Sequence, residues 1–473
     1  MFTFSFDCSI ISNMKRIQTF AENPLGFEKI GKLILRFSIP AIASNLLTAV
    51  YNIVDQIYIG QGIGPKGLAA TNIAFPMVTI VAAVAIMLGV GCAASFNLNL
   101  GAGNREKAER LAGTGLSVMA ISGLVLTAIF LIFLTPLLNL FGATKDIIEI
   151  TTDYAFIVVL GVPFQVLTVG ICQLIRADGS PTWAMICMTS GAVFNIIFDP
   201  VFMFGFGWGI KGIAWATTLG QVLSAVLAIS YIIKGMKTIR FSIRSFIPRF
   251  SNIATIFSLG LSPFANQSAI TLVTIVMNNT LSHYGDLSQF VSSTDALAAV
   301  GAISKINIIF ISCSIGIGQG CQPINSFNFG AKQYPRVRET LKKALFLNLA
   351  VGVLFFTAFQ LFPKTIISIF GDGSDEYIKF ATRYLQIFMF MTFANGLQGV
   401  TGHYFTAIGR PIISVFVSMT RQIIFLIPLL LLLPIYYGID GVVFAGPIAD
   451  SVAATLSTIF ILRELRKLRN IPA

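Results

Sequence analysis

Long apolar stretches alternate with short polar segments along this chain, from about residue 30 to its end. Each stretch is bounded by Gly, Pro or charged residues and has the length of about 20 residues that a helix needs to cross a bilayer. The pattern predicts twelve membrane-spanning helices. We expect them near residues 35–59, 67–97, 112–138, 152–175, 182–204, 210–234, 253–279, 296–327, 341–363, 379–405, 411–434 and 439–462.

Composition agrees with a polytopic membrane protein that lies in a lipid bilayer. Of 473 residues, 55% are hydrophobic and only 11% are charged, which is too apolar for an ordinary soluble domain. The net charge of +12 comes from short basic clusters between the apolar stretches, so membrane topology explains it and no nucleic-acid partner is expected. The first residues show no basic segment or cleavage site of a signal peptide, and either Met1 or Met14 could be the start of translation.

The Lys and Arg residues predict the orientation. Most of the 32 lie in the N-terminal segment, in the loops after even-numbered spans and in the C-terminal segment. The loops after odd-numbered spans hold only Lys66, Lys145, Lys211, Lys364 and Lys379. Because cytoplasmic loops carry the excess of basic residues, we expect both termini to be cytoplasmic and the protein to span the cell membrane (the inner or plasma membrane).

An internal repeat covers nearly the whole chain. Leu68-Ala-Ala returns as Leu297-Ala-Ala, and Gly101-Ala returns as Gly330-Ala, both at an offset of 229 residues. Each repeat has six spans, an even number, so the second half begins on the same side of the membrane as the first. This arrangement is typical of carriers with parallel repeats. We therefore expect an all-α membrane protein with two six-helix lobes related by a parallel pseudo-two-fold axis. The predicted parts are an N-terminal cytoplasmic segment (1–30), an N-terminal lobe (31–235), a cytoplasmic linker (236–252), a C-terminal lobe (253–465) and a cytoplasmic tail (466–473).

Two acids lie deep in the spans of the first half. Asp55 is about 7 Å from the outer end of span 1, and Asp199 lies at a similar depth in span 5. Tyr51 precedes Asp55 by four residues and Asn195 precedes Asp199 by four, so each pair occupies one helical face. Thr217 of span 6 lies at about the same depth. Since ionisable residues inside a membrane are costly, the default interpretation is an ion or substrate path.

These oxygen-rich side chains suit a proton or a hard cation such as Na⁺, with no other metal or cofactor. Two acids that share a weakly solvated site are expected to titrate as a coupled pair. The repeat places no such set in the second half, where the equivalent positions are Asn278, Ile424, Pro428 and Gly446. The alternative is that Asp55 and Asp199 are hydrogen-bonded structural residues.

Four further residues in the spans need an explanation. Asp450 and Arg421 lie at similar depths in spans 12 and 11, which favours a structural ion pair. Pro40 permits a kink in span 1, either as an ordinary feature of membrane helices or as a bend coupled to the charge of Asp55. The role of Lys305 stays open. The 42 Phe, 13 Met and 11 Tyr could also line a cavity that holds flat cations.

The ordered set of motifs resembles the MATE (multidrug and toxic compound extrusion) family, most closely its MepA-like members in the DinF branch, over about residues 25–465. The residues that carry the resemblance are Pro40, Tyr51-Asn-Ile-Val-Asp55, Asn99-Leu-Gly101-Ala102, Arg176-Ala-Asp-Gly179-Ser-Pro181, Asn195-x-x-x-Asp199-Pro200 and Asp450. The resemblance implies that Asp55, Asn195, Asp199 and Thr217 form the ion-coupling site, with Tyr51 adjacent and Pro40 at a bend. It also implies two lobes that enclose a central cavity.

We therefore expect a transporter that is not an enzyme. The resemblance implies export of small organic cations, drugs and dyes, against entry of H⁺ or Na⁺, and hence a role in drug resistance; we expect a monomer. A flippase for lipid-linked precursors is the alternative, although it would favour a more cationic cavity. An intramembrane enzyme fits poorly, because the two histidines, His283 and His403, belong to no hydrolase motif. A channel is weaker still, because the repeat supplies no ring of pore-lining residues.

Overall fold

The computed structural model describes residues 23–288, 292–368 and 374–470, and the regular secondary structure in these ranges is helical. Met1, Met14 and residues 1–22 and 471–473 of the predicted N-terminal segment and tail lie outside the described residues. Residues 466–470 of the predicted tail belong to α18. The first half consists of α2 (Pro24–Phe27), α3 (Ile30–Gly62), α4 (Pro65–Gly101), α5 (Arg105–Ile132), α6 (Leu134–Leu140), α7 (Ile148–Ala177), α8 (Pro181–Pro200), η1 (Val201–Gly205) and α9 (Ile210–Lys234). The second half consists of η2 (Ile243–Phe246), α10 (Phe250–Asp286), α11 (Ser293–Gly330), α12 (Tyr334–Leu361), α13 (Pro363–Ser368), α14 (Asp375–Phe388), α15 (Thr392–Ala407), α16 (Pro411–Met419), η3 (Thr420–Leu426), α17 (Ile427–Tyr437) and α18 (Ile439–Asn470).

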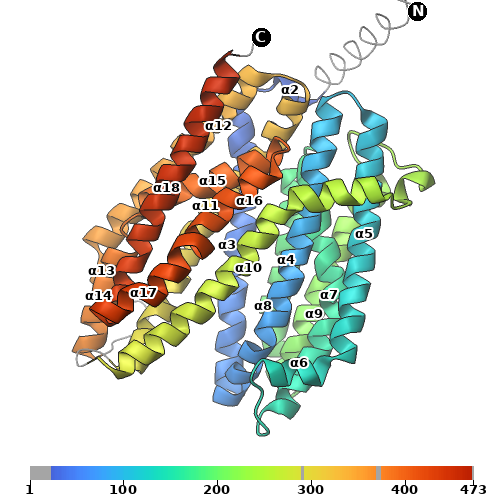
Figure 1. Cartoon of the computed structure of the whole chain (residues 1–473). Helices are drawn as coiled ribbons and strands as arrows, with labels where there is room; N and C mark the ends of the chain where they lie inside the picture. The colour runs from blue at the N-terminus through green and yellow to red at the C-terminus, as the bar shows by residue number, and fades with distance from the viewer. Residues whose placement is uncertain (1–22, 289–291, 369–373, 471–473) are drawn as a thin grey trace, which may run out of the picture.

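The helices form twelve crossings in two lobes, one from each half of the chain (Figure 1). Within the described ranges, eleven helices are long and apolar enough to span a membrane by themselves. The tenth crossing is missing from that count because it is split into α14 and α15. Our prediction of one continuous helix over 379–405 was therefore wrong, and Lys379 lies within α14 instead of in a loop.

Proline explains the break at the end of α8. Pro200 has no N–H and its ring crowds the carbonyl of the preceding turn, so α8 cannot continue with regular hydrogen bonds. The chain widens there into the π-helical segment η1. Pro40 lies inside α3, which continues through it as one helix, and the hydroxyl of Ser44 donates to the carbonyl oxygen of Pro40 over 2.8 Å.

The lobes contact each other through paired helices. α10 packs against α4, and α11 packs against α3 and α4. Gly101 of α4 and Gly330 of α11, which the repeat relates, lie at this interface. A Cβ at Gly101 would be 2.0 Å from the carbonyl oxygen of Phe327, and one at Gly330 would be 2.1 Å from that of Leu98. Only glycine permits this approach, so the two lobes are in direct backbone contact near the end of the bundle where α4 and α11 end.

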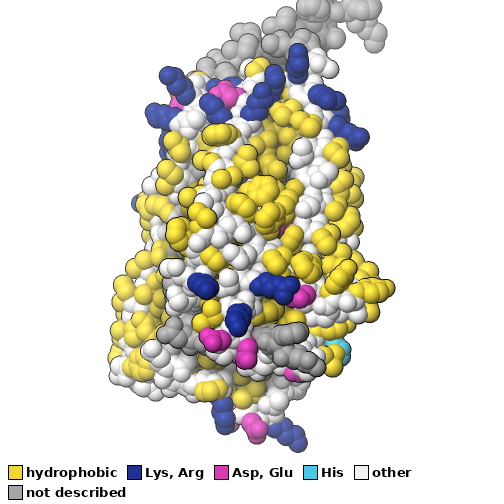
Figure 2. Space-filling model, turned by 90° about the vertical axis from the view of Figure 1, so that its left-hand side faces the viewer, with side chains coloured by type: hydrophobic (Ala, Val, Ile, Leu, Met, Phe, Trp, Pro, Cys, Tyr) yellow, Lys and Arg dark blue, Asp and Glu magenta, His cyan; other side chains and the backbone are white. Residues whose placement is uncertain are grey.

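That end of the bundle also carries the start of α3 and the end of α18 (Figure 1), and we call it the terminal end. Figure 2 shows Lys and Arg side chains gathered there, whereas hydrophobic side chains cover much of the flank below it. A belt of apolar surface between polar ends is what a bilayer requires of a membrane protein. The protein is thus a multi-pass membrane protein.

Candidate functional site

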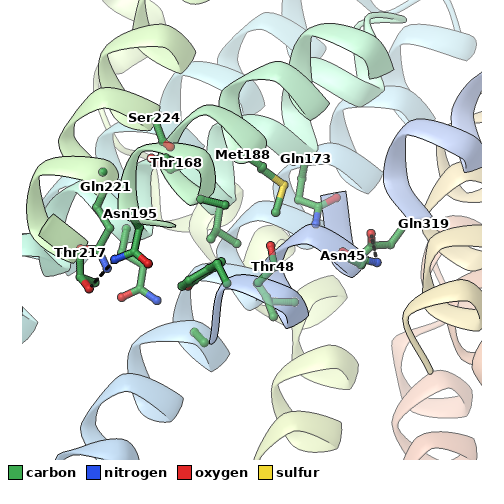
Figure 3. A pocket seen from close by; sticks show the side chains of 18 of the residues that line it. Asn45, Thr48, Thr168, Gln173, Met188, Asn195, Thr217, Gln221, Ser224 and Gln319 are labelled. Carbon is green, nitrogen blue, oxygen red and sulfur yellow. Dashed lines mark hydrogen bonds between the residues drawn. The ribbon is translucent and has the colours of Figure 1, made fainter. Parts of the chain in front are cut away.

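Asn195 connects two helices of the first lobe. Its Nδ2 donates to Asp199 Oδ1, one turn further along α8, and to Thr217 Oγ1 of α9, each over 3.0 Å (Figure 3 shows the bond to Thr217). Asn195 and Asp199 are 3% and 0% exposed, so both bonds lie in the protein interior. An amide that uses both N–H groups in this way fixes the positions of the carboxylate and the hydroxyl relative to each other.

Asp55 and Tyr51 of α3 lie next to Asn195 and Asp199. α3 packs against α8, and Asp55 is close enough to Asp199 for the two carboxyl groups to interact electrostatically. Tyr51 interacts with both acids in the same way. The structure therefore brings together the five predicted residues Tyr51, Asp55, Asn195, Asp199 and Thr217, drawn from three helices.

Three oxygens of this group lack a partner among the described residues. Asp55 Oδ1, Asn195 Oδ1 and Asp199 Oδ2 are buried and accept no hydrogen bond there. Buried polar atoms are seldom left unpaired without a functional or solvent-related reason. Nowhere in the described ranges do three His, Cys, Asp or Glu side chains converge as a metal centre would need. Two carboxylates with one amide and one hydroxyl oxygen can instead accept protons or hold a hard monovalent cation.

A cavity of about 310 Å³ adjoins these residues; its lining comes from the first lobe except for Gln319 of α11 (Figure 3). Tyr51, Asn195 and Thr217 line it, whereas Asp55 and Asp199 do not, so these three side chains form the wall between the cavity and the acids. Half of the sixteen other lining residues carry amides or hydroxyls. They are Asn45, Thr48, Gln165, Thr168, Gln173, Gln221, Ser224 and Gln319. Tyr51 is the one aromatic residue among the lining residues, so this cavity is not the aromatic-rich one that the Phe content suggested.

Two contributors were missed from the sequence. Tyr154 of α7 is buried beside the acids and interacts electrostatically with Asp55, Asp199 and Tyr51. The predicted span begins at residue 152, which puts Tyr154 only about 3 Å inside it, so the depth argument used for Asp55 did not find it. In the structure α7 begins at Ile148, and Tyr154 lies six residues, or about 9 Å, from that end. Arg176 follows the predicted span 152–175 directly and so was expected in the cytoplasmic loop after it, but the structure buries it to 3% exposure in the last turn of α7, where it lines the cavity.

The other predicted residues lie away from the group. Pro40 is fifteen residues from Asp55 on the same helix, which is about 22 Å. In the second lobe, Arg421 Nε contacts Asp450 Oδ1 in an ion pair, and both side chains are largely buried. Arg421 also lines a separate cavity of about 180 Å³ with Gln267, Asn395, Gln398 and His403. Lys305 is exposed on α11.

Comparison with known proteins shows which family the chain belongs to. The MatE family model matches residues 40–201 and 263–432, one segment in each half of the chain. The "Multidrug export protein MepA" of Staphylococcus aureus (strain MSSA476) is 24% identical over 445 residues, which cover 93% of this chain and 96% of that protein.

Solved structures show the same fold. An outward-facing multidrug resistance MATE family transporter of the MOP superfamily has a TM-score of 0.87 at 21% identity, covering 96% of this chain and 98% of that one. A MOP superfamily transporter from Pyrococcus furiosus Vc1 (DSM3638), described as having a binding pocket of reverse polarity, also has a TM-score of 0.87 at 21% identity, with 95% and 98% covered. The family match over both halves identifies the chain as a member of the MatE family, a transporter with the MATE fold.

Proposed function

We propose that this transporter exports small organic cations, such as drugs and dyes, in exchange for entering H⁺ or Na⁺. The MatE match over both halves and the extended similarity to a multidrug export protein support export of this kind. The two-lobed fold supports alternating access, in which the lobes rock about a binding site near the pseudo-two-fold axis.

The coupling ion would bind at Asp55, Asn195, Asp199 and Thr217, with Tyr51 beside them. The observation that carries this assignment is the bridging amide of Asn195, which holds Asp199 and Thr217 in place while oxygens of Asp55, Asn195 and Asp199 are left without partners. A cation or proton would satisfy those oxygens. Pro40 would let α3 bend when the charge of the group changes.

Substrate and ion would occupy neighbouring but different places. The cavity lies on one side of Tyr51 and Asn195 and the carboxyl groups lie on the other. Binding of the ion changes the charge behind this wall, and coupling follows if ion and substrate stabilise opposite orientations of the carrier. No cofactor is required for this cycle.

The membrane placement belongs to the same proposal. Lys and Arg gather at the terminal end, which supports a cytoplasmic location for both termini. We assign the protein to the cell membrane as a monomer, with lobes over residues 31–235 and 253–465 joined by the cytoplasmic linker 236–252. Arg421 and Asp450 would act as a structural pair of the second lobe.

Transport of ethidium into or out of proteoliposomes tests the proposal. A pH gradient and a Na⁺ gradient, applied separately to the purified wild-type protein, identify the coupling ion. At least one gradient should drive transport, and Asp55→Asn and Asp199→Asn should each abolish it. Asp153→Asn is the matched control, because Asp153 is a partly exposed acid of α7 paired with Lys211 on the surface. Ion-driven transport at the wild-type rate by both site variants would contradict the assignment.

A further inference from the structure

Arg176 is buried without an acidic partner in the described ranges. Its side chain is 3% exposed, and the ion pairs between described residues do not include it. Its Nη1 donates to Gln173 Oε1 over 3.0 Å, and its Nη2 lies 3.1 Å from Met188 Sδ. A guanidinium keeps its charge in proteins, and two neutral contacts do not compensate a buried charge, which ordinarily is paired.

The nearest acid along the chain is bound to other groups. Asp178 follows Arg176 by two residues, but its Oδ1 accepts a hydrogen bond from the backbone of Thr238, over 3.0 Å. Its Oδ2 accepts from the backbone of Lys237 and from the hydroxyl of Tyr231, each over 2.7 Å. Asp178 therefore holds the segment after α9, and the charge of Arg176 is left for a group that the described chain does not supply.

Arg176 lines a small pocket between the two lobes. The pocket has a volume of about 10 Å³, and its lining comes from α4 and α7 of the first lobe and α11 of the second. We call it the interlobe pocket. Its lining contains no acid among the described residues. The volume admits one species of about the size of a water molecule.

Two amides of the interlobe pocket have unused donors. Asn97 Nδ2 of α4 and Gln322 Nε2 of α11 are buried and lack partners among the described residues, and the two side chains are 0% and 5% exposed. Asn97 Oδ1 is unpartnered as well, so no other hydrogen bond fixes the orientation of this amide. Buried polar atoms are seldom left unpaired without a reason. A water molecule would satisfy the amides but not the charge of Arg176, whereas a small anion would satisfy both.

We propose that a chloride ion binds in the interlobe pocket between Asn97, Arg176 and Gln322 and stabilises the conformation in which the lobes meet at the terminal end. The pocket is too small for a phosphate or carboxylate group, whereas a halide is a single atom that accepts hydrogen bonds from several donors. Because the two lobes supply the donors together, the complete site forms only when the lobes are in contact, and binding favours that conformation. The ion is neither the coupling cation nor the substrate, so the inference goes beyond the proposed function.

Thermal unfolding of the purified wild-type protein in detergent tests the proposal. Potassium chloride replaces potassium gluconate at constant ionic strength, so that only the anion changes. A ligand that binds the folded protein stabilises it in proportion to the logarithm of its concentration. For a Kd of about 5 mM, the Tm should rise by about 2 °C between about 1 and 300 mM chloride. Bromide should act like chloride, and an equal Tm in chloride and gluconate would overturn the inference.

Asn97→Asp shows whether the anion serves Arg176. The new carboxylate would pair with the guanidinium in place of chloride, so the Tm should no longer depend on chloride. Arg176→Gln should also lose this dependence, because the charge is removed. Asn104→Asp is the matched control, since it adds the same negative charge at an exposed position between α4 and α5 and should keep the chloride effect. The full wild-type increase in Tm in folded Asn97→Asp or Arg176→Gln would reveal a general salt effect and overturn the inference.

Crystals of the wild-type protein soaked in sodium bromide locate the ion without any variant. An anomalous peak is expected in the interlobe pocket, next to Asn97 and Gln322. Lobes in contact at the terminal end and no peak between them would contradict the proposal. None of these measurements involves transport, so a negative result would leave the proposed function standing.

Discussion

Arg336, in the first turn of α12, donates a hydrogen bond of 2.7 Å from Nη2 to the carbonyl oxygen of Glu28, which joins α2 to α3. The same nitrogen lies 3.1 Å from the carbonyl oxygen of Leu25, and Asn328 of α11 donates to that oxygen over 2.9 Å. The segment that leads into the first lobe is therefore held by the second lobe.

The segment that leads into the second lobe is held by the first lobe in turn. Glu109 of α5 accepts hydrogen bonds from the backbone of Ser242, over 2.7 Å, and from the hydroxyl of Ser245. Ser117 of α5 donates to the carbonyl oxygen of Phe246 over 2.7 Å. At the terminal end, each lobe thus holds the segment that precedes the other lobe. We expect these two sets of hydrogen bonds to stabilise the conformation in which the lobes meet there.

Removal of the Arg336 contacts should loosen the terminal end. In Arg336→Gln, the carbonyl oxygens of Leu25 and Glu28 lose a charged donor, worth about 1.5–3 kcal/mol per bond when buried and less at a partly exposed position such as this one. Ser326→Cys, on a cysteine-free background, reports the change because Ser326 is buried and lines a small pocket of about 10 Å³ to which both lobes contribute. Maleimide should label it faster in Arg336→Gln than in Lys342→Gln, an exposed control on α12. Equal labelling rates in the two variants would argue against a stabilising role.

The glycine contacts between the lobes predict a second effect. Gly101→Ala and Gly330→Ala each place a Cβ about 2 Å from a carbonyl oxygen of the opposite lobe, and overpacking of this kind costs about 1–3 kcal/mol. Both should lower the Tm of the purified protein. Gly301→Ala is the control, because a Cβ there meets nothing within 4 Å and alanine favours helix over glycine. The interface described above would be wrong if all three variants melted at the wild-type temperature.

The ion pair of Arg421 and Asp450 should stabilise the second lobe without taking part in coupling. Asp450→Asn leaves the largely buried guanidinium without its acid, and breaking a buried pair costs about 3–5 kcal/mol. The double replacement by Met at both positions should recover most of this loss, because no unpaired charge remains. Thermal unfolding of the wild type, Asp450→Asn and the double variant measures these changes in stability. A structural role predicts ion-driven ethidium transport by the double variant; a stable double variant without transport would assign the pair a part in the cycle.

The sequence predicts the architecture well because the bilayer imposes it. Spans must be apolar and of a fixed length, so the runs ending near Gly101 and Gly330 are visible without any tertiary information. Depth along each span, read at 1.5 Å per residue, also predicts that Asp55, Asp199 and Thr217 lie at one level, and the structure brings them together around Asn195.

Tertiary packing decides what the sequence could not predict. Arg176 precedes an Ala-Asp-Gly turn and resembles a loop residue, and only its packing beside Met188 of the next helix shows that it is buried. The bonds of Arg336 to Leu25 and Glu28 join parts of the chain about 300 residues apart and have no counterpart in the repeat pattern. The split between α14 and α15 falls within a continuous apolar run and carries no proline.

The central claim is that the buried acids bind the ion that drives transport, behind a wall that separates them from the substrate. Gradient-driven ethidium transport by Asp199→Asn in proteoliposomes tests it most directly, with Asp153→Asn as the control and ethidium binding measured on the same preparations. We predict that Asp199→Asn binds ethidium with a Kd within about threefold of the wild type but shows no transport under either a pH or a Na⁺ gradient. Transport at the wild-type rate under the gradient that drives the wild type would contradict the claim.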